Sequence, residues 1–170
     1  MKPLSKLISM NSLGLMAALI LAACTTQLSE TADGAPLARQ ITASDQCGVG
    51  SQGLTYLRDE DNLARLGDWP MQNLSMKPLR ALDFDREHIL IVGLGQKPTG
   101  GFGLTLANSQ ILDGTFRLTV ILRRPPADAV VSQALTTTCV VMAITPERWR
   151  RLEVNGNGLD TLKLDRKFNR

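Results

Sequence analysis

The chain has 170 residues, which is the length of one domain. Its 19 basic and 16 acidic side chains nearly cancel, and two of the basic ones, Lys2 and Lys6, stand at the very start. A near-neutral chain offers no basis for nucleic-acid binding, and the single His excludes zinc sites built on several His ligands.

Residues 1–23 predict a secretory signal peptide. Lys2 and Lys6 give a positive start, and an apolar run from Leu13 to Ala23 follows. This run is too short to cross a bilayer, which needs about 20 residues. A charged start, a short apolar core and small residues before a cleavage site are the features of an exported chain.

The predicted leader ends in Leu21-Ala22-Ala23-Cys24, which resembles the lipobox of bacterial lipoproteins. The resemblance implies cleavage before Cys24 and acylation of Cys24, and several acyl chains on one residue anchor a protein stably. Thr25 follows Cys24 where an Asp would signal retention, which implies export to the outer membrane. The alternative is an ordinary signal peptide with a chance Cys.

Residues 24–43 are rich in Thr, Ala, Ser, Gln, Asp and Gly and show no sustained apolar period. This composition predicts a flexible tether between the lipid and the folded part. A single β-rich domain is expected over residues 44–170.

Cys47 and Cys139 remain once Cys24 is assigned to lipid. Two thiols in an oxidising envelope predict a disulfide. It would close a loop of about 90 residues and stabilise the fold by roughly 4–5 kcal/mol. The alternative is two buried, unpaired thiols, since the sequence does not supply the required Cα geometry.

One short helix is expected near the start of the domain, after a strand over residues 49–57. Asp59, Glu60 and Asp61 suit a first helical turn, and Leu63, Leu66 and Trp69 give an apolar stripe. Gly67 and Pro70 are helix stop signals. Trp69 is expected to be a packing anchor.

Short strands separated by turn residues dominate the rest of the chain. They are expected at 88–92 as a central strand, at 102–107, at 116–123 before Pro125-Pro126, at 137–144, and on both sides of the 155–158 turn. Asp113-Gly114 predicts a hairpin, residues 127–134 a loop, and Pro146 one helical turn up to residue 151. The fold class is therefore mainly β (α+β): a small antiparallel β sandwich or barrel-like domain with one or two short helices.

The glycine-rich stretch from residue 92 to 103 invites a phosphate-binding interpretation. It lacks the Lys and Ser or Thr of a P-loop, and Pro98 stands where the third glycine of a dinucleotide fingerprint would be. A strand-like segment, not a helix, follows it. The stretch is therefore expected to join two antiparallel strands, and Val at Gly100 or Gly101 to destabilise through φ strain.

A family resemblance rests on this stretch. The turn comprises Gly95, Lys97, Pro98, Thr99, Gly100, Gly101 and Phe102, and around it stand Asp83-Phe84-Asp85, the strands 88–92 and 116–122, the Pro-Pro loop and the strand 140–144. In this order they resemble the C-terminal domain of the protease-complex subunit PrcB family, over about residues 84–146. The sequence departs at Thr138-Cys139, where a Pro-aromatic pair is expected.

The resemblance implies a non-catalytic envelope lipoprotein that binds or stabilises a protein partner, such as a secreted or periplasmic protease complex. It implies no catalytic residues, no metal and no cofactor. His88 opens an apolar strand and is expected to be structural, and no Ser stands in a nucleophile elbow.

Two alternatives stay open. Residues 97–102 are similar to the Asn-Pro-Thr-Thr-Gly-Tyr loop of chagasin-type cysteine-protease inhibitors, which favours a loop-type inhibitor. Trp149, with Arg148, Arg150 and Arg151, could contact lipid headgroups or glycan, or form a small-ligand-binding module, although a solvated basic turn also explains these residues.

Overall fold

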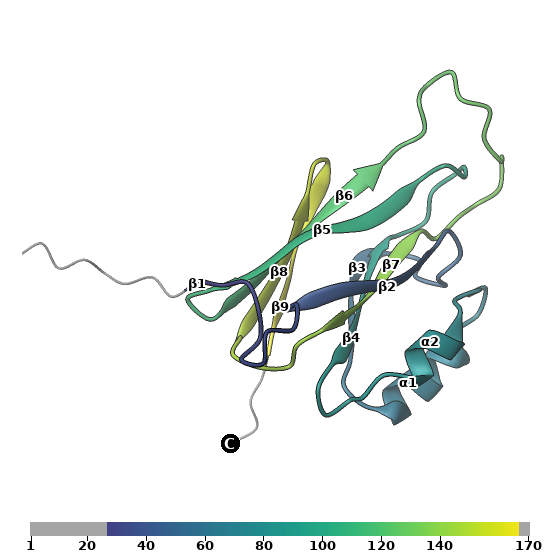
Figure 1. Cartoon of the computed structure of the whole chain (residues 1–170). Coiled ribbons are helices and arrows are strands. Elements are labelled where there is room, and N and C mark those ends of the chain that lie inside the picture. The colour runs from purple at the N-terminus through teal and green to yellow at the C-terminus, as the bar shows by residue number, and fades with distance from the viewer. Residues whose placement is uncertain (1–26, 167–170) are drawn as a thin grey trace, which may run out of the picture.

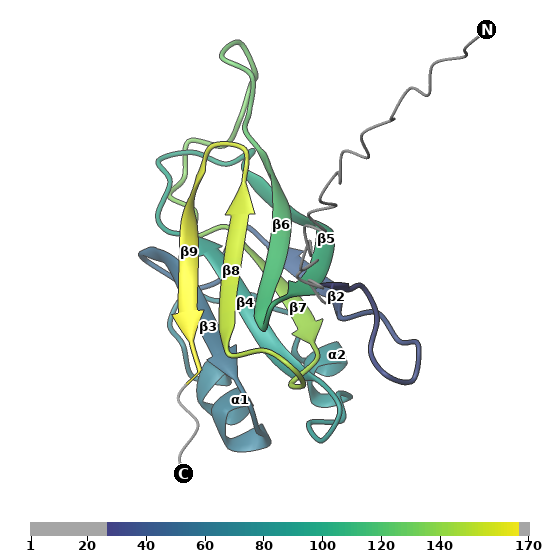
Figure 2. The same cartoon turned by 90° about the vertical axis from the view of Figure 1, so that its left-hand side faces the viewer.

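Two β-sheets pack face to face in the computed structural model, which describes residues 27–166 (Figure 1). The five-stranded sheet has the order β1 (Gln27–Leu28), β5 (Gly103–Leu112), β6 (Thr115–Arg123), β8 (Arg151–Gly156) and β9 (Leu159–Asp165). The four-stranded sheet has the order β2 (Ala38–Ser44), β7 (Cys139–Ile144), β4 (His88–Leu94) and β3 (Gln52–Leu57). Two short helices, α1 (Glu60–Gly67) and α2 (Met76–Arg80), cover the outer face of the four-stranded sheet (Figure 2). The predicted fold class is confirmed as an open sandwich, and β6 with β8 is the one parallel pair among the described strands.

The central strands β4 and β7 are buried on both faces. Because side chains alternate along a strand, Leu90 and Val92 face the other sheet, whereas Ile89 and Ile91 face the helices. The side chains of β7 alternate between the same two faces. Burial on both sides explains why these strands are continuous apolar runs in the sequence.

Helix α1 begins and ends close to the predicted positions. The Asp59 carboxylate accepts a hydrogen bond from the backbone N–H of Asn62 at 2.7 Å and caps the first turn. Leu63 and Leu66 are buried against the sheet, and Trp69 is half-buried against the same cluster.

The helical turn predicted for residues 146–151 is wrong. Residues 146–150 form an irregular segment with bends, Arg151 begins strand β8, and Arg148 has a left-handed φ of 65° that breaks the helical path. The break lets the chain send Trp149 inward, where only 1% of it is exposed.

The tether predicted for residues 24–43 is wrong in its second half. Ala38–Ser44 is strand β2, and it pairs antiparallel with β7 from Ala38 opposite Ile144 to Ser44 opposite Cys139. Leu37, just before it, is buried in the core. This strand lies at the edge of the sheet, and most of its side chains are exposed or half-buried. Its composition is therefore polar and resembles that of a tether. The predicted leader and Cys24 lie outside the described residues.

The predicted pairing of Cys47 with Cys139 is present as a disulfide, with Cα atoms 6.0 Å apart and a sequence separation of 92. Both residues are fully buried on the helix side of the four-stranded sheet. Within residues 27–166, none of the helices has the length and apolar character needed to span a membrane.

Candidate functional site

The signature turn, residues 95–102, carries the chain from one sheet to the other. It leaves β4 of the four-stranded sheet and enters β5 of the five-stranded sheet. The prediction that it joins two paired strands is wrong, because β4 pairs with β3 and β7, whereas β5 pairs with β1 and β6. The turn closes one end of the sandwich (Figure 1).

Backbone hydrogen bonds tie this turn to the connection between β6 and β7. Lys97 and Thr136 exchange two of them, with N···O distances of 2.8 and 2.9 Å. The N–H of Gly100 donates to the carbonyl of Ser132 at 2.9 Å, and the hydroxyl of Thr136 donates to the carbonyl of Thr99 at 2.9 Å. The turn and residues 132–136 therefore form one connected unit.

Only some of the glycines in the turn need their backbone freedom. Gly95 and Gly101 have φ values of +70° and +88°, in the left-handed region that favours glycine. A Cβ on Gly101 would lie 2.9 Å from side-chain carbons of Pro125 and Val131. Gly100 lies outside that φ region, and a Cβ there would meet Ser132 at an ordinary 3.4 Å. The predicted φ strain applies to Gly101 and is wrong for Gly100.

The remaining turn residues divide between core and surface. Phe102 packs against the core between the sheets, and Gly100 is buried. Pro98 is exposed, and Lys97 is half-buried. Because strand β5 follows the turn, no helix N-terminus is present to bind a phosphate there.

The connection tied by the turn projects beyond both sheets. It runs from residue 124 to 138 between β6 and β7, and its residues 124–135 are here called the β6–β7 loop (Figures 1 and 2). Val130 is completely exposed, and Leu135 is 56% exposed. These two side chains are apolar area that a partner could bury at a projecting point. The β6–β7 loop and the signature turn together are called the apical surface.

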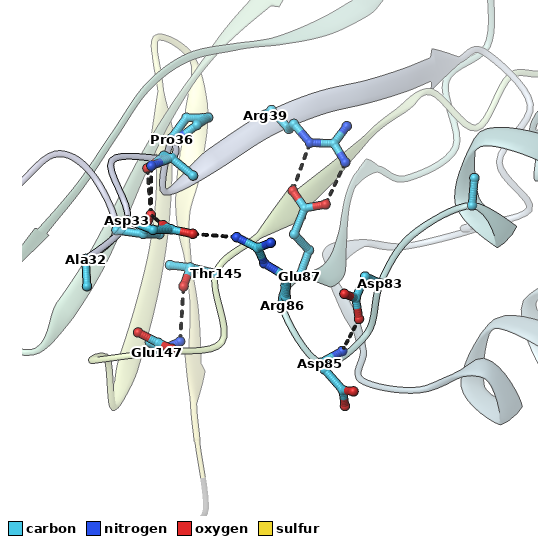
Figure 3. Close-up of a pocket in the computed structure, with 13 residues that line it drawn as sticks. Ala32, Asp33, Pro36, Arg39, Asp83, Asp85, Arg86, Glu87, Thr145 and Glu147 are labelled. Atoms are coloured by element: carbon cyan, nitrogen blue, oxygen red, sulfur yellow. Dashed lines mark hydrogen bonds and ion pairs between the residues drawn. The ribbon is translucent and has the colours of Figure 1, made fainter.

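A charged crevice of about 610 Å³ lies elsewhere, between the segment before β2 and the turn before β4 (Figure 3). The Arg39 guanidinium donates two hydrogen bonds to the Glu87 carboxylate, at 2.8 and 2.6 Å, and Arg86 pairs with Asp33. The Glu87 carboxylate raises the pKa of Arg39, and the Thr31 hydroxyl is the main cause of a lowered pKa for Asp33. These pairs hold two chain segments together, and the crevice needs no ligand to explain them.

The described residues contain no group of three or more His, Cys, Asp or Glu side chains placed to hold a metal. A nucleophilic Cys–His pair is also not assembled in the described residues, because Cys47 and Cys139 are bonded to each other. The His88 ring nitrogen Nδ1 is hydrogen-bonded to the Tyr56 hydroxyl, and burial is the main cause of a lowered pKa for His88.

Trp149 does not offer a binding platform. Its Nε1 donates to the Thr145 carbonyl at 2.8 Å, and its ring packs against Tyr56 and Phe116. The Arg166 guanidinium lies 4.7 Å from the ring centroid. A buried indole cannot stack on a sugar, so the glycan-binding alternative loses the residue on which it rested.

The sequence did not single out the β6–β7 loop as a functional surface. It predicted a loop at 127–134 from Pro125-Pro126 and attached no role to it. The usable signal was Val130-Val131, an apolar pair inside a predicted loop, because loops that only connect strands are usually polar.

Two open sheets with a tied, projecting loop at one end place this protein in the class of β sandwiches. Residues 88–145, from the start of β4 to the residue after β7, match the family model described as PrcB C-terminal. This confirms the resemblance predicted for residues 84–146, and the match includes the signature turn and the β6–β7 loop. The family match suggests that the protein is a subunit related to a protease complex. Searches of the curated proteins and of the solved structures gave no significant match.

Proposed function

We propose that the protein is a non-catalytic, lipid-anchored envelope subunit that binds a protein of a protease complex through its apical surface. The observation that carries this proposal is the junction of the family's signature turn with the projecting loop. The turn lies inside the matched segment, and its hydrogen bonds to Ser132 and Thr136 hold the end of the loop that presents Val130.

Preorganisation supports binding by this loop. Its start is held where the Arg124 side chain donates to the Gly158 carbonyl at 2.7 Å, and its end is held by the signature turn. A loop that is already ordered loses less conformational entropy when a partner binds. Val130 and Leu135 then supply apolar area that becomes buried in the complex.

The anchor proposal rests on Cys24, which precedes the first described strand by three residues. β1 pairs with the far end of β5, at Ile111 and Leu112, whereas the β6–β7 loop lies beyond the opposite end of the sheet. Ten strand residues at about 3.4 Å each separate the two ends by roughly 30 Å. Anchoring in the outer membrane would therefore present the loop away from the lipid.

Site-specific photo-crosslinking in intact envelopes tests the proposal. A photoreactive residue at Val130 is expected to capture a protease or another subunit of a protease complex, identified by mass spectrometry. The matched control is the same residue at Thr161, which is exposed on β9. Capture of no such protein at Val130, or equal capture at Thr161, would contradict binding by the loop.

A loop-type protease inhibitor is the second candidate, because a projecting loop tied at both ends could also enter a protease cleft. For an inhibitor we propose the β6–β7 loop as the inserted segment in place of residues 97–102, because Gly100 is buried. Activity of the captured protease separates the two functions. If the protein is a subunit, the protease stays active in the complex. If it is an inhibitor, the protease is inactive in the complex, and the Val130→Asp variant restores its activity.

A further inference from the structure

At the end of the sandwich opposite the apical surface, Arg148, Arg150 and Arg166 surround a cavity of about 410 Å³. We propose that this basic end face contacts the phosphate groups of anionic lipids in the membrane that holds the anchor. The inference rests on the lipid anchoring proposed above and extends it to a second, non-covalent contact with the bilayer.

The local backbone explains how the arginines come together. The N–H of Arg150 donates to the carbonyl of Gly114 at 2.8 Å, so residues 148–150 are docked on the β5–β6 hairpin turn. Trp149 points inward, and its neighbours Arg148 and Arg150 are exposed. Arg166 lies over the Trp149 ring and donates to the Pro146 carbonyl.

Two of these guanidinium groups are available to an anion. In the part of the chain that the structure describes, Arg148 and Arg150 form no salt bridge, whereas the adjacent Arg151 is paired with Asp165 at 2.8 Å. A guanidinium presents a planar fork of N–H donors that fits two oxygens of a phosphate group. Glu147 is exposed and adjacent to Arg148, and Asp113 is adjacent to Gly114 in the hairpin turn; among the described residues neither carboxylate is in a salt bridge with these arginines.

The position of the predicted anchor is the reason for proposing a membrane as the partner of the basic end face. Gln27 pairs with Leu112, directly beside the hairpin turn on which Arg150 is docked. Cys24 is three residues from Gln27 along the chain, and consecutive Cα atoms are about 3.8 Å apart, so an acyl group on Cys24 would be tethered within roughly 11 Å of this pair. The anchor therefore holds headgroups at high effective concentration beside the basic end face.

Hydrogen exchange measured by mass spectrometry on the lipidated full chain tests this contact. The chain is reconstituted in vesicles of phosphatidylethanolamine with phosphatidylglycerol, or of phosphatidylcholine alone. We expect amides of residues 146–151 to exchange about five-fold more slowly or better in the anionic vesicles, the size of effect that one basic residue near an anionic surface supplies. Screening at about 1 M salt should abolish the difference.

The Arg148→Ser/Arg150→Ser variant should lose the protection, and Arg123→Ser/Arg124→Ser, with the same charge change at the apical end of β6, should keep it. Melting curves confirm that both variants fold. Equal exchange in the two vesicle types, or equal loss in the two variants, overturns the proposal. Protection by inorganic phosphate alone in phosphatidylcholine vesicles also overturns it, because the site would then bind free anions.

The mass of the purified chain separates this proposal from the one on which it rests. A chain without acyl mass refutes the anchor, and in that case the proposed contact fails with it. An acylated chain without anionic protection refutes the basic end face and leaves the anchor and the apical surface standing.

Discussion

Gly101 provides the sharpest test of how the signature turn works. Its φ is +88°, and in Gly101→Ala the new Cβ would stand 2.9 Å from carbons of both Pro125 and Val131. A left-handed conformation costs an L-residue about 1–2 kcal/mol, and overpacking typically costs about 1–3 kcal/mol more. The lower entropy of the unfolded alanine chain offsets about 0.4–1 kcal/mol. Taken at the middle of these ranges, the net loss is about 3 kcal/mol.

Gly100→Ala is the matched control, since its φ is ordinary and its new Cβ would meet Ser132 at 3.4 Å. We expect a change within about 1 kcal/mol there. For a domain of this size each kcal/mol corresponds to about 3–4 °C, so Gly101→Ala should melt about 9–12 °C below the parent chain. Thermal unfolding followed by circular dichroism measures both variants with the disulfide intact. If Gly101→Ala and Gly100→Ala melt together, the assigned backbone strain is wrong.

Three further results are expected. In the double variant Cys47→Ala/Cys139→Ala, the free energy of unfolding in urea should fall by about 4–5 kcal/mol, because a loop of 92 residues is no longer closed. An unchanged urea midpoint would contradict this. Trp149→Ala should lower the free energy of unfolding by about 3–5 kcal/mol. Trp149→Phe should lower it clearly less, since Phe loses mainly the hydrogen bond to Thr145, and equal losses would refute the packing role. Burial lowers the pKa of His88, so the unfolded chain takes up the proton first and stability should fall as the pH drops below about 6.5. His88→Asn should flatten that slope in urea midpoints, and an unchanged slope would show that His88 is not its source.

Local patterns predicted much of the fold because they report on local physics. The apolar run at 88–92 indicated a central strand because burial on both faces requires such a run. Asp113 and Gly114 indicated a hairpin, and both have the positive φ values that this turn needs. Asp59 indicated the start of α1 because its carboxylate can cap the first turn.

The errors concern properties that depend on distant residues. Nothing in residues 38–44 states that β7 will pair with them, so a polar edge strand looks like a tether. The path of the signature turn was mispredicted for a related reason: glycines at 95 and 101 indicate a turn but not which sheet receives the next strand. The projecting loop became a candidate site only when its exposed Val130 and its bonds to the turn could be placed together.

The disulfide also has a consequence for the order in which the chain is made. A growing chain that has reached Ile144 already contains Cys47, Cys139 and every strand of the four-stranded sheet. It still lacks Trp149 and strand β8, which fill the core between the sheets. The four-stranded sheet can therefore be locked covalently before strands β8 and β9 complete the five-stranded sheet. Until the last residues arrive, the part of the core that Trp149 and β8 fill stays open, and a chain truncated near residue 145 would be oxidised correctly and still be prone to aggregate.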